Sequence, residues 1–166
     1  MNRDLIDIAN KENNTAAFIF LDQEKAFDRV NHNFLFKVMR SFGIGESFIE
    51  WIHLFYSNAS AVLNVNGFLS KPIPFNRGVK QGCPLSSFLY VMVIEILALQ
   101  LRANPNIVGF RIGGEKIVSA HYMDDATIII KQNRCFKEVI KDIAQYGEAS
   151  VAKVNYKKAN GLWVGN

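Results

Sequence analysis

Cysteine is scarce in this sequence of 166 residues, which contains only Cys83 and Cys135, far apart in the chain. No CxxC pair and no Cys/His pair with zinc-ligand spacing occurs, which argues against a structural zinc site. Two thiols do not make a disulfide framework, so we expect a reducing, intracellular compartment. There we expect both cysteines to serve as small buried hydrophobic side chains.

The sequence also has little that suits a membrane. It does not open with a basic start followed by an apolar stretch, so we expect no signal peptide. The strongest apolar run, residues 88–99, is too short to span a bilayer and contains Glu95, which favours a buried core helix. Repeats, low-complexity stretches and linkers are missing as well. We therefore expect residues 1–166 to form a single domain with no membrane partner.

The composition is that of a folded protein. Hydrophobic residues make up 49% of the chain and include thirteen Phe, which provides material for a packed core. The net charge is +4. This charge fits a polyanionic partner but indicates one only weakly, because the sequence has no dense block of Lys and Arg.

Periodicity and turn signals predict alternating short strands and helices. Asn66-Gly67 tolerates positive φ at both positions and therefore predicts a tight hairpin turn between residues 61–65 and 68–75. Gly113-Gly114 predicts a second hairpin, between residues 110–112 and 116–122. This order favours an α+β fold with helices packed on one face of an antiparallel sheet. The remaining predicted strands are 17–21, 126–131 and 162–164, and the predicted helices are 3–12, 33–42, 46–56, 84–102 and 134–148.

Three carboxylates stand at the ends of predicted strands. Asp124 and Asp125 join two β-rich stretches, and Asp22 follows the apolar strand 17–21. An isolated Asp-Asp pair is more often a solvated turn, and a lone Asp after a strand is more often a cap. If the strands are neighbours, however, Asp22 and Asp124 converge on one side of a sheet. Such a group suits hard divalent ions, and two of them about 4 Å apart can activate a 3′-hydroxyl and stabilise leaving pyrophosphate.

Four segments carry a specific resemblance. Residues 20–28 (FLDQEKAFD) resemble motif A of non-LTR reverse transcriptases, and residues 77–86 (RGVKQGCPLS) resemble their motif B. Residues 122–125 (YMDD) resemble motif C, and residues 155–165, with NYKK and GLWVG, resemble the D region. All four occur in the order of the family with similar gaps. The chain therefore resembles the reverse transcriptases of LINE-type (non-LTR) retrotransposons, with a group II intron-type enzyme as the nearest enzymatic alternative.

The resemblance implies a polymerase palm with a ferredoxin/RRM-like βαββαβ core, whose fingers upstream and thumb downstream are missing. The implied reaction adds dNTPs to the 3′-hydroxyl of a DNA primer on an RNA template, with two Mg²⁺ ions or with Mn²⁺ as the alternative. For a eukaryotic element the implied location is the cytoplasm and nucleus. Asp22 and Asp124 would be the principal metal ligands, with Asp125 completing the acidic site and the backbone carbonyl of Gln23 assisting. Tyr122 would belong to the substrate-binding part of motif C.

The resemblance implies further roles outside the acidic site. Phe27 would lie under the incoming sugar and exclude a 2′-hydroxyl, although core packing also explains a Phe there. Gln81 would lie beside the nascent base pair, while Gly78 and Gly82 would let the backbone approach nucleic acid. Lys158 would stand near the leaving phosphate as a proton donor or charge stabiliser, or would be a solvated surface lysine.

The sequence also departs from the family pattern. Met123 stands where LINE-type enzymes usually have Ala, and Ala159 stands where Ser or Thr is common. Two readings other than an active enzyme stay open: an inactive truncated relic, and a nucleic-acid-binding module that keeps binding without Asp22 and Asp124. We expect Trp51 and Trp163 to be core residues.

Overall fold

The computed structural model describes Asp7, residues 15–112 and residues 114–164. The predicted helix at residues 3–12 therefore lies outside the described residues, apart from Asp7. The chain divides into two compact units. We call residues 1–26 with 94–166 the sheet unit and residues 27–93 the helical unit. The single domain expected from the sequence stays a prediction.

The sheet unit is built on four antiparallel strands in the order β10-β1-β9-β8. The central strands are apolar because both carry core residues: Phe18 in β1 and Ile128 and Ile129 in β9 are all completely buried. The predicted strands at 17–21, 126–131 and 162–164 are thus confirmed, with small shifts at their ends. The strands are β1 (Ala16–Asp22), β8 (Ser119–Tyr122), β9 (Asp125–Ile130) and β10 (Asn160–Val164).

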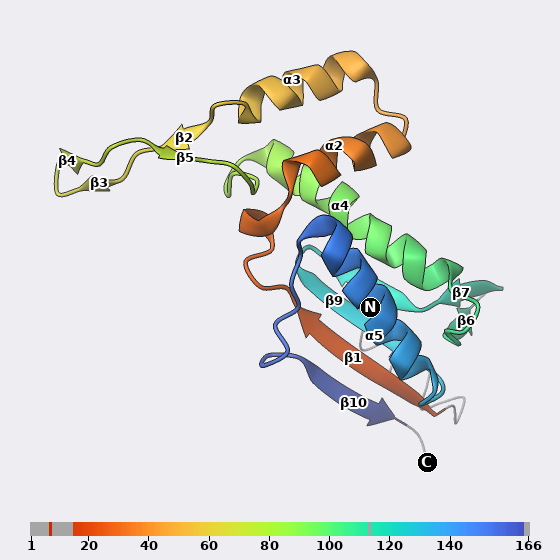
Figure 1. The fold of residues 1–166 in the computed structure, drawn as a ribbon. Coiled ribbons are helices and arrows are strands. Elements are labelled where there is room, and N and C mark those ends of the chain that lie inside the picture. Colours follow the sequence, from red (N-terminus) through yellow and green to blue (C-terminus); the bar gives the residue numbers. More distant parts are fainter. Residues whose placement is uncertain (1–6, 8–14, 113, 165–166) are drawn as a thin grey trace. The chain divides into compact units, whose positions relative to one another are not determined.

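Helix α5 (Cys135–Ser150) covers one face of this sheet and runs roughly along its strands (Figure 1). Its buried face includes Cys135, Val139, Ile143 and Tyr146, spaced as an amphipathic helix requires. Helix α4 (Pro84–Ala103) runs through both units. Within the sheet unit, the end of α4 connects to α5 because the side-chain amides of Gln100 and Asn104 donate to the buried carboxylate of Asp142. The mixed helix and strand content agrees with the predicted α+β class.

One predicted strand is wrong as a single element. Residues 116–122 break at the fully buried Val118 into β7 (Glu115–Ile117) and β8. Strand β7 pairs with β6 (Phe110–Ile112), whereas β8 pairs with β9 in the main sheet. The segment must leave one ladder before it joins the other, and the alternation of side chains cannot indicate such a change of partner.

The helical unit contains the helices predicted between residues 33 and 56, as α2 (His32–Ser41) and α3 (Glu46–Tyr56). The side chain of Asn31 accepts a hydrogen bond from the backbone N–H of Phe34 and thereby begins α2. The predicted hairpin turn is confirmed, since φ is 51° at Asn66 and 88° at Gly67. The other elements are η1 (Phe27–Arg29), β2 (Ser60–Ala61), β3 (Asn64–Val65), β4 (Phe68–Leu69) and β5 (Ile73–Pro74).

Several expectations about burial are wrong. Trp51 and Trp163 are 62% and 46% exposed, so neither is a core residue. Helix α3 buries only Ile49 and Ile52, because a short helix at the surface covers its neighbours with a narrow stripe. Of the cysteines, Cys135 is buried as expected and Cys83 is half-buried. In the apolar run 88–99, which we expected to be a buried core helix, Phe88, Val91 and Leu99 lie exposed.

Helix α4 accounts for the strongest apolar run. Among the described helices, α4 is long and apolar enough to cross a membrane by length and composition alone. Core helices of soluble proteins pass the same test. The prediction of a core helix is correct for one face, which carries the buried Leu89, Val93, Leu97 and Leu101.

Candidate active site

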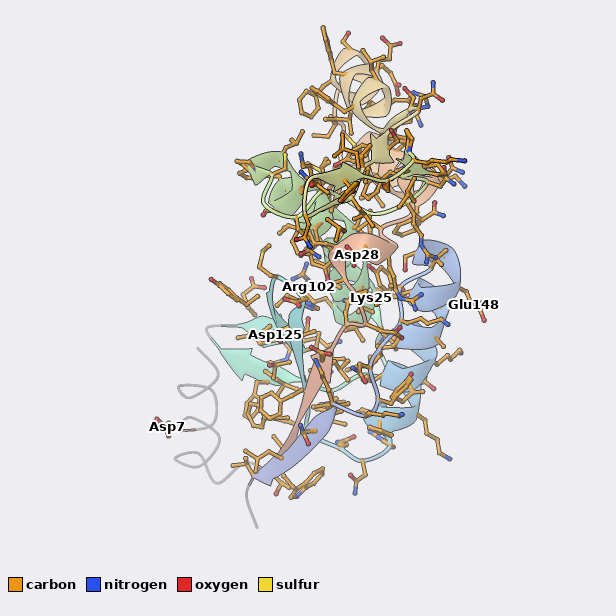
Figure 2. All side chains as sticks on the ribbon, turned by 90° about the vertical axis from the view of Figure 1, so that its left-hand side faces the viewer. Asp7, Lys25, Asp28, Arg102, Asp125 and Glu148 are labelled. Carbon is orange, nitrogen blue, oxygen red and sulfur yellow. The ribbon has the colours of Figure 1, made fainter. Side chains whose placement is uncertain are left out.

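The acidic site lies where β1, β9 and β8 come together at one end of the sheet. Asp22 and Asp125 are direct cross-strand partners, and Asp125 is also the partner of Tyr122. Figure 2 shows Asp125 and Lys25, which follows β1, at this same end of the sheet. The condition set by the sequence, that the strands carrying Asp22 and the Asp124-Asp125 pair be neighbours, is met.

Asp124 stands in the two-residue turn Met123-Asp124 between β8 and β9. Met123 has a φ of 54°, in the left-handed region that side chains other than Gly rarely adopt. The fixed backbone conformation of this strained turn sets the direction in which the side chains at its end point. Asp124 is half-buried and Asp125 is exposed, so both carboxylates can be reached from solvent.

Among the residues that the structure describes, Lys158 is the cation that lies beside these carboxylates. Its Nζ lies 3.5 Å from Oδ2 of Asp22, and the two side chains are 68% and 27% exposed. The backbone N–H of Asn155 donates to the carbonyl of Asp22 at 2.9 Å, and the N–H of Lys158 donates to the carbonyl of Asn155. The D-region turn is thus attached directly to the end of β1, which is how Lys158 comes to face Asp22.

Gln23 follows Asp22 and is 8% exposed. It forms a β-bridge with Val154, and the N–H of Glu24 donates to the carbonyl of Lys153. Gln23 also lines a cavity of about 500 Å³ within the sheet unit, between α5 and residues 152–156. Burial raises the pKa of Tyr146, another lining residue, so its phenol stays neutral.

The helical unit holds the other predicted site residues. The ring of Phe27 stacks on that of Tyr90, with centroids 4.9 Å apart and planes at 15°. Because Tyr90 is 1% exposed, it forms a fixed base for the Phe27 ring. The N–H of Val79 donates to the carbonyl of Phe27, which joins the motif A segment to the motif B segment.

Further hydrogen bonds connect these two motifs. The N–H of Gly78 donates to the carbonyl of Val30 at 2.7 Å, and the carbonyl of Gly78 lies 2.7 Å from Nε2 of His32. The amide of Gln81 donates to the carboxylate of Asp28 at 3.2 Å. Gly82 has a φ of 82° and open space around it. Asp28 thus anchors the loop that carries Gln81.

His121 precedes Tyr122 in β8. Both of its ring nitrogens are buried without a hydrogen-bond partner among the described residues. Burial lowers the pKa of His121, the attraction of Glu95 opposes this shift, and the charge of Arg102 adds to it. Glu95 and Arg102 also pair with each other. Burial therefore favours the neutral imidazole of His121 beside motif C.

Some residues of this arrangement carry no signal in the sequence. Tyr90, His32 and Asn155 support Phe27, Gly78 and Asp22 across long stretches of chain. Nothing in their spacing indicates the contact.

In the described part of the chain, no group of three or more His, Cys, Asp or Glu side chains is gathered closely enough to hold a metal ion. The metal and substrate roles of the site residues stay predictions.

Residues 2–163 match the profile of the family described as reverse transcriptase (RNA-dependent DNA polymerase). The chain belongs to the reverse transcriptase family. This reverse transcriptase segment is 34% identical over 165 residues to the uncharacterized 149 kDa protein of transposon TX1 from Xenopus laevis. It is 30% identical over 160 residues to the Pol polyprotein of the type-1 retrotransposable element R2 from Popillia japonica. The resemblance to LINE-type enzymes is confirmed.

The segment is a small part of these relatives. The matches cover 99% and 96% of this chain but 12% and 22% of the two relatives. Among solved structures, telomerase from Candida tropicalis, determined with a fragment of telomeric RNA, matches with a TM-score of 0.72 at 14% identity. That match covers 97% of this chain and 29% of the telomerase chain. Telomerase from Candida albicans matches with a TM-score of 0.62. At such identities the likeness shows a shared fold alone.

Proposed function

We propose that residues 1–166 are the catalytic palm of an RNA-directed DNA polymerase of a non-LTR retrotransposon, and one domain of a longer enzyme. The observation that carries the proposal is the pairing of Asp22 with Asp125 at the end of β1 and β9, with Asp124 in the adjoining turn. The antiparallel order β10-β1-β9-β8, together with α4 and α5, supports a ferredoxin-like βαββαβ core within the sheet unit.

The carboxylates Asp22, Asp124 and Asp125 fit hard divalent ions. They offer oxygen ligands, and Asp22 and Asp125 stand on paired strand positions. The ammonium of Lys158 offsets part of their charge. Mg²⁺ keeps water and takes phosphate oxygens as further ligands, so one or two carboxylates can hold it. We propose two Mg²⁺ ions held by these carboxylates, with the Gln23 carbonyl assisting. Bound there, the ions would activate the primer hydroxyl and neutralise charge on the leaving pyrophosphate.

The proposed substrates are an RNA template, a DNA primer and dNTPs. The primer 3′-oxygen forms a bond to the α-phosphorus of the dNTP, and the bond to the bridging oxygen of pyrophosphate breaks. Lys158, an exposed ammonium at the acidic site, would stabilise the departing phosphate or give it a proton. Phe27, fixed on Tyr90, would form the wall that excludes a 2′-hydroxyl. The remaining roles proposed for nucleic-acid or nucleotide contact fall to Gly78, Gln81, Gly82 and Tyr122.

The test is primer extension on an RNA template with dNTPs and Mg²⁺ by the longer enzyme that carries this segment, because the segment alone lacks fingers and thumb. It compares the parent enzyme with its Asp124→Ala and Glu148→Gln variants. Glu148 is an exposed carboxylate near the C-terminal end of α5 and serves as the matched control (Figure 2). We expect extension by the parent and by Glu148→Gln and none by Asp124→Ala. Extension that persists in Asp124→Ala would overturn the proposal, as would template–primer binding by a folded parent that supports no synthesis in any metal.

A further inference from the structure

The acidic site carries more negative than positive charge. Asp22 and Asp125 are cross-strand partners at the end of the sheet, and Asp124 stands in the adjoining turn. Among the described residues, Lys158 is the cation that pairs with one of these carboxylates, Asp22. Carboxylates on paired strand positions repel one another unless a cation neutralises them. The Lys158 ammonium therefore supplies compensating charge at Asp22.

The chain holds this lysine at Asp22 through its backbone. Asn155 binds the carbonyl of Asp22, and the N–H groups of Lys158 and Ala159 both donate to the carbonyl of Asn155, at 3.0 and 3.1 Å. The turn that carries Lys158 is thus fixed to the end of β1. The Lys158 side chain itself is 68% exposed and can leave Asp22 without disturbing the turn.

We infer that Lys158 is an internal competitor for the metal site: in the metal-free protein its ammonium binds Asp22, and a divalent ion must displace it. The inference rests on the proposed role of Asp22 as a metal ligand. It also makes metal binding and release of Lys158 from Asp22 a single event. The lysine would then become available for the leaving phosphate only in the metal-loaded site.

The experiment is Mn²⁺ binding to the full chain without nucleic acid or dNTP, followed by electron paramagnetic resonance of the free ion. Lys158→Met removes the competing charge, and Lys157→Met is the matched control because Lys157 is an exposed neighbour in the same turn. An exposed ion pair contributes little, so we expect Lys158→Met to bind Mn²⁺ about two- to fivefold more tightly. The gain should shrink as ionic strength rises. Lys157→Met should bind Mn²⁺ as the parent does.

The variant Asp22→Asn distinguishes a failure of the proposed competition from a failure of the proposed metal site. If it abolishes Mn²⁺ binding while Lys158→Met leaves the affinity unchanged or lower, the competition is wrong and the proposed metal site stands. If Asp22→Asn leaves Mn²⁺ binding unchanged, the proposed metal site itself is wrong. Far-ultraviolet circular dichroism of each variant confirms that the fold is retained.

Discussion

Asp22 and Asp125 are the last cross-strand pair of β1 and β9, so two carboxylates face each other at adjacent strand ends. Like charges in this position destabilise a sheet. The strands leading to the pair are completely buried at Phe18 and Ile129, which fixes the register and leaves the carboxylates no freedom to slip apart. The core thus holds the acidic groups together against their repulsion, which is the arrangement that cation binding requires.

Asp125→Asn should stabilise the protein. Removing one charge relieves the repulsion, and we expect the free energy of unfolding to rise by about 0.2–1 kcal/mol in urea titrations without divalent ions. Glu148→Gln on α5 should leave it unchanged. Added Mg²⁺ should reduce the advantage of Asp125→Asn, because the ion neutralises the same charges in the parent. A lower free energy of unfolding in Asp125→Asn would contradict the role assigned to the pair.

Phe27→Val should relax the choice of sugar. The smaller side chain removes the ring that Tyr90 supports, so primer extension with ribonucleotides should rise relative to deoxynucleotides, by tenfold or more. Phe27→Tyr keeps the ring and should keep the selectivity. Tyr90→Leu removes the stacking partner alone and should give an intermediate ratio. Equal ratios in all three variants would mean that Phe27 serves only the core.

Gly78→Ala should be more costly than Gly82→Ala. Both glycines have left-handed φ values, 89° and 82°. A Cβ on Gly78 would lie 2.9 Å from the carbonyl oxygen of Asp28, whereas one on Gly82 would meet nothing within 4 Å. We expect Gly82→Ala to cost about 1 kcal/mol from backbone strain and Gly78→Ala about 1–3 kcal/mol more from overpacking. Urea unfolding of both variants measures the difference, and equal costs would contradict the close approach of the two motifs.

His121 should make the protein less stable in mild acid. Since burial lowers its pKa, the folded state binds a proton less readily than the unfolded chain, and stability falls as the pH drops below about 6.5, the unfolded value. The loss continues down to the folded pKa at up to about 1.4 kcal/mol per pH unit. Urea unfolding at pH 7.5 and 5.5 should therefore show a smaller loss in His121→Gln than in the parent. His53→Gln, at an exposed histidine, should behave as the parent does.

Most elements follow from local rules that the sequence displays. Pro84 begins α4, Asn31 caps α2, and Asn66-Gly67 adopts the two positive φ values of its turn. The break at Val118 was missed because a strand that changes partner keeps its alternation. Trp51 and Trp163 were misplaced because large aromatic side chains favour burial on average, whereas burial at one position depends on which neighbours cover it.

The sequence by itself determined the family, the helices and the carboxylates, since motif order, periodicity and turn residues are local properties of the chain. Only the tertiary structure decided which strands are neighbours, that Asp22 faces Asp125 while Lys158 reaches Asp22, and that Phe27 rests on Tyr90. These contacts join residues far apart in the chain. They depend on sheet order and on how a closed core is packed, which no single stretch of sequence encodes.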